Sequence, residues 1–416
     1  MADRGRRDAV VVVGAGLAGA KAVEGLRDQG FDGPVTLVGS ERHLPYERPP
    51  LTKDHLFGTV SDDVLFVHDE PWYAERDVDV LLGTTAVELD RHVREVVTAG
   101  GRRLPYGHVL LATGSSPRLL SVPGSDLDGV LYLRTLDDNQ RVKACLVPGA
   151  RLVVIGGGWI GMETAAAARR LGAEVTVLEA GDVPLGRVLG PKIGEAFADL
   201  HREHGVDVRR RVQVDRIDGD GEGHVRAVVL RDGTRLRADV VVGGIGVVPN
   251  DGLARAAGLA VDNGVLVDEH LRTTDPRVLA AGDVANALHP LLGRHVRVEH
   301  WANALNQPAV AAGTIIGADV VYDRLPYFYT DQFELGMEYV GYVPADTHAS
   351  VVVRGDLAGR KFVAFWVAHS RVLAGMNVNV WDVGDDVQRL VLSGVAVDAH
   401  ALADPEVPLE ALLPSS

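Results

Sequence analysis

The stretch VVIGGGWIGMETAAAARRLGAEVTVLEA, residues 153–180, decides the fold of this chain. Residues 151–155, an arginine followed by four apolar residues, predict a buried parallel strand, and the pattern Gly156-x-Gly158-x-x-Gly161 follows it directly. The alanine-rich residues after the glycines predict a helix, and the last residues predict the next strand. In this order, the glycines let the backbone approach a pyrophosphate at the helix N-terminus.

A second copy of this unit lies near the N-terminus. Residues 9–13 and 33–40 predict two strands around a helix, and the loop between strand and helix reads Gly14-x-Gly16-x-x-Gly19. The alternative is a secretory signal, because basic residues precede an apolar stretch, but it leaves the glycine pattern unexplained. Two copies in one chain predict two dinucleotide sites, each in a doubly wound domain of its own.

Composition limits the possible functions. A chain of 416 residues suits two or three domains, and its net charge of −15 argues against sequence-independent nucleic-acid binding. No apolar run approaches the roughly 18 residues of a membrane span, and we expect a cytoplasmic location.

The single cysteine, Cys145, excludes an internal disulfide, a dithiol pair and a cysteine-ligated cluster. We expect Cys145 to be buried, and the histidine spacings predict no metal site.

An acidic residue at the end of the second strand binds ribose hydroxyls in such units. Glu179 holds this place after the second loop, and its carboxylate would repel a 2′-phosphate, which favours NADH over NADPH. Arg187 lies close in sequence and keeps NADPH open as the alternative. After the first loop the strand ends at Gly39, and Glu41 comes two residues late; it either replaces the usual acid or is a solvated loop charge.

The remaining segments divide the chain. Strands that end at glycine turns, in residues 108–118 and 239–250, mark where the chain crosses between domains. After residue 324, three antiparallel strands and a short helix predict a smaller α+β domain. We therefore predict an α/β fold of the glutathione-reductase type, with two Rossmann-like domains and a C-terminal domain. The predicted domains are residues 1–115 with 247–323, residues 116–246, and residues 324–416.

These motifs resemble those of the two-dinucleotide flavoproteins, specifically the NADH-dependent ferredoxin reductases of oxygenase systems. The resemblance covers essentially the whole chain. The motifs that carry it are GAGLAG, LPYERPPLTK, LLATGSSPR, GGGWIGME, GIGVVPN, TTDPRVLAAGD and HWANALNQ.

The resemblance implies FAD at the first loop and NADH at the second. It implies hydride transfer from NADH to the flavin, then single electrons to an iron–sulfur ferredoxin that feeds a haem monooxygenase or a Rieske-type oxygenase. It implies that FAD is bound by the following residues: Arg48, Lys53, Trp301 and Tyr329 near the flavin, Asp283 at the ribityl chain, and Thr113 and Gly114 where the chain leaves the FAD domain. It places Ile160 and Gly246 in the second site.

Some of these residues have structural alternatives. Asp283 could be an ordinary strand-end carboxylate, and Trp301 and Tyr329 could be core aromatics. Relatives commonly carry tryptophan where this chain has Tyr329, which puts a stacking or electron-exit role for this residue in doubt.

Glu163 is unexpected beside a phosphate site. The resemblance implies that it faces Lys53 beside flavin N5, so that the two form a charge-compensated, partly buried pair. The alternative is a glutamate in the first helical turn that only complements the helix dipole.

Other functions remain open. An NADH oxidase or peroxidase would need a cysteine near the flavin, and residues 40–53 contain none. A rubredoxin or monodehydroascorbate reductase is closer. A different class is an NADH-sensing flavoprotein of the apoptosis-inducing-factor type, in which turnover is incidental.

Overall fold

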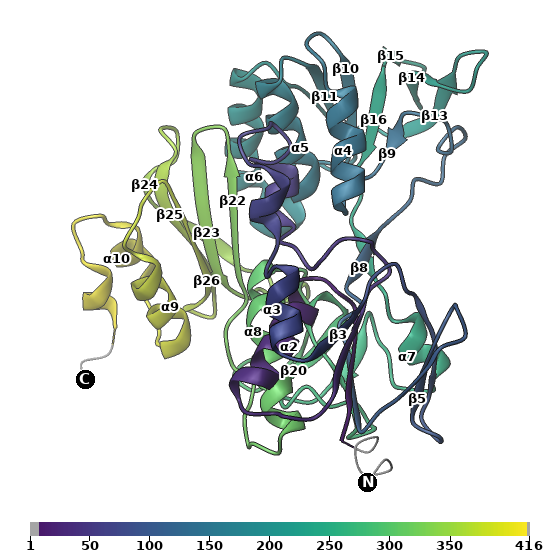
Figure 1. The fold of residues 1–416 in the computed structure, drawn as a ribbon. Helices are drawn as coiled ribbons and strands as arrows, with labels where there is room; N and C mark the ends of the chain where they lie inside the picture. The colour runs from purple at the N-terminus through teal and green to yellow at the C-terminus, as the bar shows by residue number, and fades with distance from the viewer. Residues whose placement is uncertain (1–7, 414–416) are drawn as a thin grey trace. The chain divides into compact units, whose positions relative to one another are not determined.

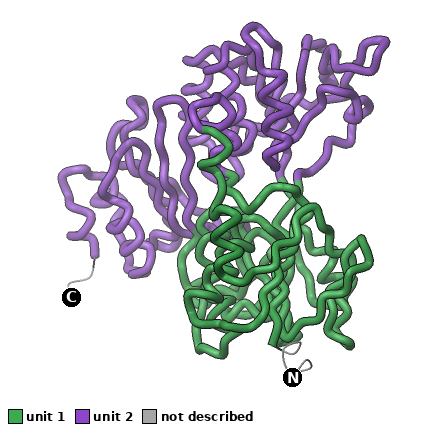
Figure 2. Tube along the Cα trace, in the orientation of Figure 1, with its two compact units in different colours: residues 1–48, 61–116, 247–326 green, residues 49–60, 117–246, 327–416 purple. Residues whose placement is uncertain are grey.

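The computed structural model describes residues 8–413, which fold into two compact units (Figure 2). Unit 1 contains residues 8–48, 61–116 and 247–326. Unit 2 contains residues 49–60, 117–246 and 327–413. The expected division into three domains stays a prediction, and its outermost residues, 1–7 and 414–416, lie outside the described chain.

The main sheet of unit 1 has five parallel strands in the order β19-β7-β1-β2-β3. Its edge strand β3 is labelled in Figure 1. Its strands are β1 (Val10–Val13), β2 (Val35–Val38), β3 (Val78–Leu81), β7 (His108–Leu111) and β19 (Val278–Ala280). The central strand β1 consists of four buried valines, as expected for a parallel strand covered on both faces. Helix α2 (Leu17–Asp28) follows it and packs on α8 (Trp301–Ile315).

Smaller elements complete unit 1. An antiparallel sheet contains β4 (Ala86–Asp90), β5 (Glu95–Thr98) and β6 (Arg103–Pro105). A mixed sheet contains β18 (Val265–Val267), β20 (Ala285–His289) and β21 (Arg294–Val296). The remaining helices and short strands are η2 (Asp62–Leu65), α3 (Glu70–Glu75), α7 (Gly252–Ala256), η3 (Gly282–Val284), β8 (Ser115–Pro117) and β17 (Val247–Pro249).

Unit 2 repeats the parallel arrangement, with the strand order β12-β11-β10-β16-β9. Its strands are β9 (Val130–Leu131), β10 (Arg151–Ile155), β11 (Glu174–Glu179), β12 (Asp207–Arg210) and β16 (Val240–Gly243). Its helices here are η1 (Pro49–Thr52), α4 (Leu136–Cys145), α5 (Trp159–Arg170) and α6 (Gly186–Glu203). An antiparallel sheet adds β13 (Val214–Gly219), β14 (Val225–Leu230) and β15 (Arg235–Arg237).

In both parallel sheets the glycine loop follows the central strand. β1 lies between β2 and β7, and β10 lies between β11 and β16. The order of the strands along the chain reverses there, which is the position where open α/β sheets bind ligands. The predicted α/β class with two doubly wound sheets is confirmed.

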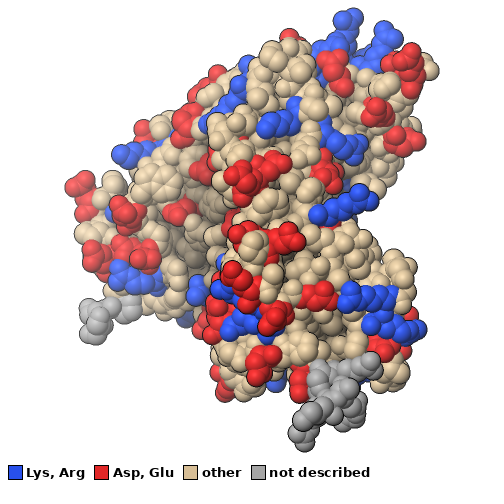
Figure 3. Space-filling view, in the orientation of Figure 1, with Lys and Arg blue, Asp and Glu red and all other residues tan. Residues whose placement is uncertain are grey.

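The C-terminal part of unit 2 is a five-stranded antiparallel sheet in the order β22-β23-β26-β25-β24. Its elements are β22 (Tyr327–Gln332), β23 (Leu335–Gly341), β24 (Ser350–Asp356), β25 (Lys361–Ala368), β26 (Arg371–Val378), α9 (Gly384–Ser393), α10 (Ala399–Ala403) and η4 (Leu409–Leu412). The sequence predicted the last three strands and α9, but β22 and β23 were not anticipated. On the face shown in Figure 3, acidic and basic side chains are interspersed.

Candidate functional site

The first glycine of each loop occupies a backbone conformation that other residues avoid. Gly14 has φ +118° and Gly156 has φ +110°. A Cβ atom on Gly14 would overlap the carbonyl oxygen of Ala112, and one on Gly156 would overlap that of Gly244. Both turns therefore require glycine for its φ and for its size.

The other two glycines of each loop have separate tasks. A Cβ on Gly19 or Gly161 would overlap the carbonyl oxygen of the first glycine of the same loop, so these positions bring helix and strand together. Gly16 and Gly158 are the N-caps of α2 and α5 and supply no side chain to bond the first N–H groups. Nothing lies within 4 Å of a Cβ built on Gly16, and the nearest atom at Gly158 is 3.7 Å away. Two open helix N-termini fit the pyrophosphates of two dinucleotides.

Glu179, the acid expected at the end of a strand, lies against the second loop. Its Oε2 accepts a hydrogen bond from the Gly157 N–H at 2.9 Å, and its Oε1 accepts one from Gly181 at 2.5 Å. Its carboxylate is therefore fixed at the carboxyl end of β11. Arg187 is exposed on the first turn of α6.

Two further residues expected at the second site lie on either side of this loop region. Ile160 is half-buried in the first turn of α5. Gly246, with φ +100°, follows β16.

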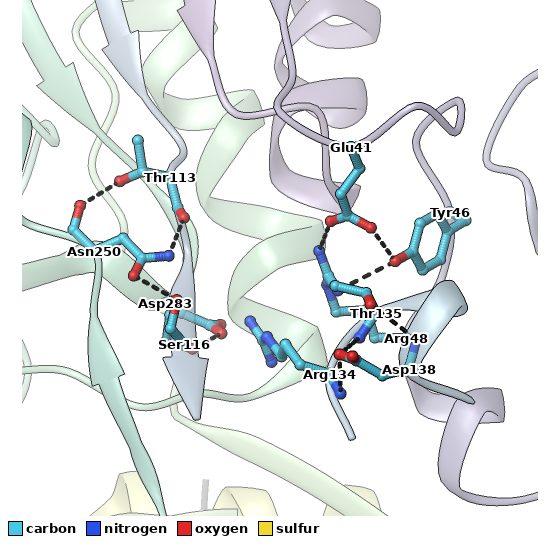
Figure 4. A network of polar contacts seen from close by, with 11 residues as sticks. Glu41, Tyr46, Arg48, Thr113, Ser116, Arg134, Thr135, Asp138, Asn250 and Asp283 are labelled. Carbon is cyan, nitrogen blue, oxygen red and sulfur yellow. Dashed lines mark hydrogen bonds and ion pairs between the residues drawn. The ribbon is translucent and has the colours of Figure 1, made fainter. Parts of the chain in front are cut away.

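Glu41 is part of a polar cluster in unit 1 (Figure 4). Its Oε1 pairs with Arg48 Nη2 at 2.7 Å, and its Oε2 accepts a hydrogen bond from the Tyr46 hydroxyl at 2.5 Å. The side chain is thus held by two partners, which argues against the alternative of a solvated loop charge.

Asn250 joins two distant segments of unit 1 (Figure 4). The Thr113 hydroxyl donates to the Asn250 carbonyl, and Asn250 Nδ2 donates to the Thr113 carbonyl, both at 2.8 Å. The Ser116 hydroxyl donates to Asn250 Oδ1 at 2.8 Å. Gly114, with φ +66°, lies inside this clamp. The clamp fixes the chain where it leaves the first parallel sheet.

Two further expected residues lie at helix starts in unit 1. Asp283 is in η3, and its Oδ2 accepts a hydrogen bond from the Ser115 hydroxyl at 2.8 Å. Trp301 is the first residue of α8, and its indole N–H donates to Glu47 Oε2 at 2.8 Å. Trp301 is half-buried rather than enclosed in the core.

The Glu163 carboxylate is buried in unit 2, with 6% exposure. Its Oε1 lies 3.2 Å from Lys53 Nζ and accepts a hydrogen bond from the Thr330 hydroxyl at 2.5 Å. Its Oε2 accepts one from the Thr52 hydroxyl at 2.5 Å. Because α5 begins at Trp159, Glu163 lies beyond the first turn, and the alternative of a first-turn glutamate that complements the dipole is wrong.

The segment that carries Lys53 is held in place by two helices. η1 packs against α4 and α5. The buried Asn139 of α4 donates to the Leu51 carbonyl at 2.6 Å, and its Oδ1 lies 2.8 Å from His55 Nδ1. Lys53 Nζ also lies 4.8 Å from the ring centroid of Tyr329 in β22, within the range of a cation–π interaction.

Sequence reasoning missed three residues that build these clusters: Thr52, Asn250 and Thr330. Thr52 and Asn250 lie in motifs that carried the resemblance, and Thr330 follows Tyr329, but hydroxyl and amide groups give no spacing signal of their own. The expectation that Cys145 is buried is only partly met, since it is half-buried at the end of α4. Burial raises the pKa of its thiol, which disfavours the reactive thiolate.

Within residues 8–413, no group of three or more His, Cys, Asp or Glu side chains is arranged to hold a metal ion. None of the described helices is long and apolar enough to cross a membrane.

Comparison with known proteins identifies the family. Residues 8–308 match the model for pyridine nucleotide-disulphide oxidoreductases, and residues 327–413 match a reductase C-terminal domain. The chain is 42% identical over 411 residues to the ferredoxin–NAD(+) reductase component of the anthranilate 1,2-dioxygenase system of Burkholderia cepacia, covering 98% of this chain and 99% of that one. It is 38% identical over 410 residues to putidaredoxin reductase of Pseudomonas putida, covering 98% and 97%.

Solved structures agree with the sequence matches. Putidaredoxin reductase in its covalent complex with putidaredoxin has a TM-score of 0.93 at 38% identity, with 97% of both chains covered. The ferredoxin reductase for the CYP199A2 system of Rhodopseudomonas palustris has a TM-score of 0.92 at 35% identity, with 97% of this chain and 99% of that chain covered. The chain belongs to the pyridine nucleotide-disulphide oxidoreductase family.

Proposed function

We propose that this protein is an FAD-dependent NADH:ferredoxin reductase that serves an oxygenase system. The observation that carries the proposal is a pair of open glycine loops, each at the switch point of its own parallel sheet in one chain. Relatives that match nearly the whole chain are named as ferredoxin–NAD(+) or putidaredoxin reductases. The single cysteine is consistent with a family member that works without a redox disulfide.

We assign FAD to the first loop and NADH to the second. For FAD we propose Gly14, Gly16, Gly19, Glu41, Arg48, Lys53, Thr113, Gly114, Asp283, Trp301 and Tyr329. For NADH we propose Gly156, Gly158, Ile160, Gly161, Glu179, Arg187 and Gly246. The matching domains are residues 1–115 with 247–323 for FAD, 116–246 for NADH and 324–416 at the C-terminus.

When bound, FAD accepts two electrons together and releases them one at a time. The chain's own groups bind and orient the nucleotides. The N-termini of α2 and α5 attract phosphates, and Glu179 disfavours a 2′-phosphate by charge repulsion. The N-terminus of α8 carries positive potential and would stabilise negative charge on a bound flavin. Lys53 and Glu163 supply a fixed, buried ion pair and form no covalent bond.

The electron acceptor is an iron–sulfur ferredoxin, which passes electrons to a haem monooxygenase or a Rieske-type oxygenase. The anthranilate dioxygenase relative and putidaredoxin reductase support this class of partner. We place the reaction in the cytoplasm, where NADH is the available reductant; neither nucleic acid nor a membrane is a partner.

Anaerobic titration of the purified yellow protein tests the proposal. NADH should bleach the flavin at lower concentration than NADPH, and cytochrome c reduction should require an added [2Fe–2S] ferredoxin. A protein that stays colourless after incubation with FAD, or a flavin that NADH never bleaches, contradicts the proposal. Rapid oxygen consumption without ferredoxin would identify an NADH oxidase instead.

A further inference from the structure

A chain of buried polar groups runs through unit 2 behind Glu163. Thr330 and Gln332 lie on the same face of β22, and His201 lies in α6; all three are 0% exposed. Successive distances are 2.5 Å from Thr330 Oγ1 to Glu163 Oε1, 3.3 Å from Gln332 Nε2 to Thr330 Oγ1, and 2.8 Å from His201 Nε2 to Gln332 Oε1. Buried polar groups are costly unless paired, so this row needs an explanation.

The hydrogen bonds in this row of buried groups all run in one direction, from donor to acceptor. The carboxylate of Glu163 only accepts, so Thr330 donates to it, and the Thr330 oxygen accepts from the Gln332 amide nitrogen. Gln332 then presents its carbonyl oxygen to His201, which must carry its proton on Nε2. Burial lowers the pKa of His201 to about 4, so the ring is neutral and has one proton to give. Its Nδ1 has no hydrogen-bond partner among the described residues, in agreement with this tautomer.

Every link therefore donates toward Glu163. With Thr52 on the other oxygen and Lys53 beside the first, the carboxylate accepts from three groups. Hydrogen bonds to an ionised group are short and strong, and a chain of them polarises each member. The arrangement fixes the carboxylate in place, and the carboxylate in turn holds the ammonium group of Lys53.

We propose that Thr330, Gln332 and His201 are positioning residues that act on the flavin reaction through Glu163 and Lys53. This inference rests on the proposed function, because it assigns the ion pair to the reduction of FAD by NADH. The alternative is that the same residues only fasten β22 to α6. The two accounts differ in whether their effect on the reaction disappears once Glu163 has lost its charge.

A double-mutant cycle separates them. Thr330→Val keeps the shape and removes the hydroxyl, while Thr330→Ser keeps the hydroxyl as a matched control. In anaerobic stopped-flow experiments with NADH, we expect Thr330→Val to slow flavin reduction about tenfold with unchanged NADH affinity, and Thr330→Ser to stay within about twofold. In a Glu163→Gln background, Thr330→Val should change the rate less than about twofold. Equal slowing in both backgrounds would overturn the proposal and leave only a structural role.

The histidine tautomer provides a readout that does not depend on activity. The flavin-loaded protein is labelled with ¹⁵N-histidine, and the His201 signals are assigned by their loss in His201→Gln. At pH 6, long-range ¹H–¹⁵N spectra should show His201 as neutral with its proton on Nε2. Gln332→Leu should abolish that preference and slow flavin reduction. A protonated His201, or one with its proton on Nδ1, would overturn the proposal even if the Thr330 variants fold poorly.

Failure of the proposed function has a different signature. If NADH does not reduce the wild-type flavin, the assignment of the reaction is wrong, and the positioning role falls with it. The other outcome is that NADH reduces the wild-type flavin and ferredoxin turnover follows, but the effects of Thr330→Val and Glu163→Gln on the rate of flavin reduction simply add. In that case only the positioning role is wrong.

Discussion

The helices at the two glycine loops carry side chains of opposite charge at the same position. Two residues after the third glycine, unit 1 has Lys21 and unit 2 has Glu163. The Lys21 side chain is 23% exposed and pairs with its helix neighbour Glu24 at 2.8 Å. Glu163 is 6% exposed and pairs with Lys53, which comes from a distant part of the chain. The loops fix the backbone alike, but the residues that cover each helix decide what its side chains do.

The covering elements explain the difference. η1 and β22 pack on α5 in unit 2. They bring Thr52 and Thr330 to Glu163, and Lys53 follows directly after η1. A charge enclosed in this way must be paired, since burying it alone costs several kcal/mol. At Lys21 the partner is local and water still reaches the pair, so little energy depends on it.

The largest expected effect comes from breaking the buried pair. Lys53→Ala should lower the free energy of unfolding by about 3–5 kcal/mol, because it leaves Glu163 buried and uncompensated. It should also slow flavin reduction by NADH while FAD stays bound. Denaturant titration and stopped-flow absorbance measure the two effects.

Lys21→Ala is the matched control for this variant. It should cost less than about 1 kcal/mol and leave flavin reduction unchanged. Equal losses for the two lysines would contradict the contrast between the loops, and unchanged flavin reduction in Lys53→Ala would remove Lys53 from the mechanism.

The next largest effect is a pH dependence of stability, and it is caused by His201 in the row of buried polar groups behind Glu163. His201 titrates near its ordinary value of 6.5 when unfolded and at about 4 when folded. As pH falls from 6.5 toward 4, the unfolded chain takes up a proton that the folded one refuses, so stability is lost. The loss attributable to His201 should reach about 3 kcal/mol by pH 4.

Comparison of His201→Phe with wild type isolates the loss of stability that is caused by His201. The stability difference between the two proteins should shift in favour of the variant by this amount between pH 7 and pH 4, measured by denaturant titration at each pH. A pH-independent difference for His201→Phe would mean that the imidazole is protonated in the folded state.

The sequence predicted well the features that local patterns encode. Both glycine loops and the strands beside them follow from the spacing of the glycines and from the apolar runs that precede them. The three strands β24 to β26 were readable because turn residues separate long strand-forming runs. The acid Glu179 was readable because its place after the strand is fixed by the motif.

The surroundings of Glu163 could not be predicted in the same way. Its partners come from η1 and β22, and no periodicity links those segments to α5. The pairing with Lys53 came from the resemblance alone, and Thr52 and Thr330 were missed because a hydroxyl group is common in any segment. β22 itself was missed because its aromatic residues are half-buried and its buried positions hold the polar Thr330 and Gln332, so that the strand lacks apolar alternation.

A smaller effect tests whether Glu179 in unit 2 and Glu41 in unit 1 act on different nucleotides. Glu179→Gln keeps an oxygen to accept from the loop but removes the charge that disfavours a 2′-phosphate. The ratio of kcat/KM for NADH to that for NADPH should fall about tenfold, or ~1.4 kcal/mol. Glu41→Gln in unit 1 should leave this ratio unchanged while weakening FAD binding. A ratio that responds to Glu41 and not to Glu179 would reverse the assignment of the two nucleotides.

The smallest effect tests the same assignment with a single methyl group in each loop. Gly16 and Gly158 have extended backbones and room for a Cβ, so alanine at either N-cap should cost only about 0.5–1 kcal/mol of stability. The methyl group would instead crowd a pyrophosphate at the helix N-terminus. We expect Gly16→Ala to weaken FAD binding about fivefold, or ~1 kcal/mol, and Gly158→Ala to weaken NADH binding to the same extent with FAD retained. Flavin release on gel filtration and equilibrium NADH titration measure these constants; loss of NADH affinity in Gly16→Ala with FAD intact would exchange the two sites.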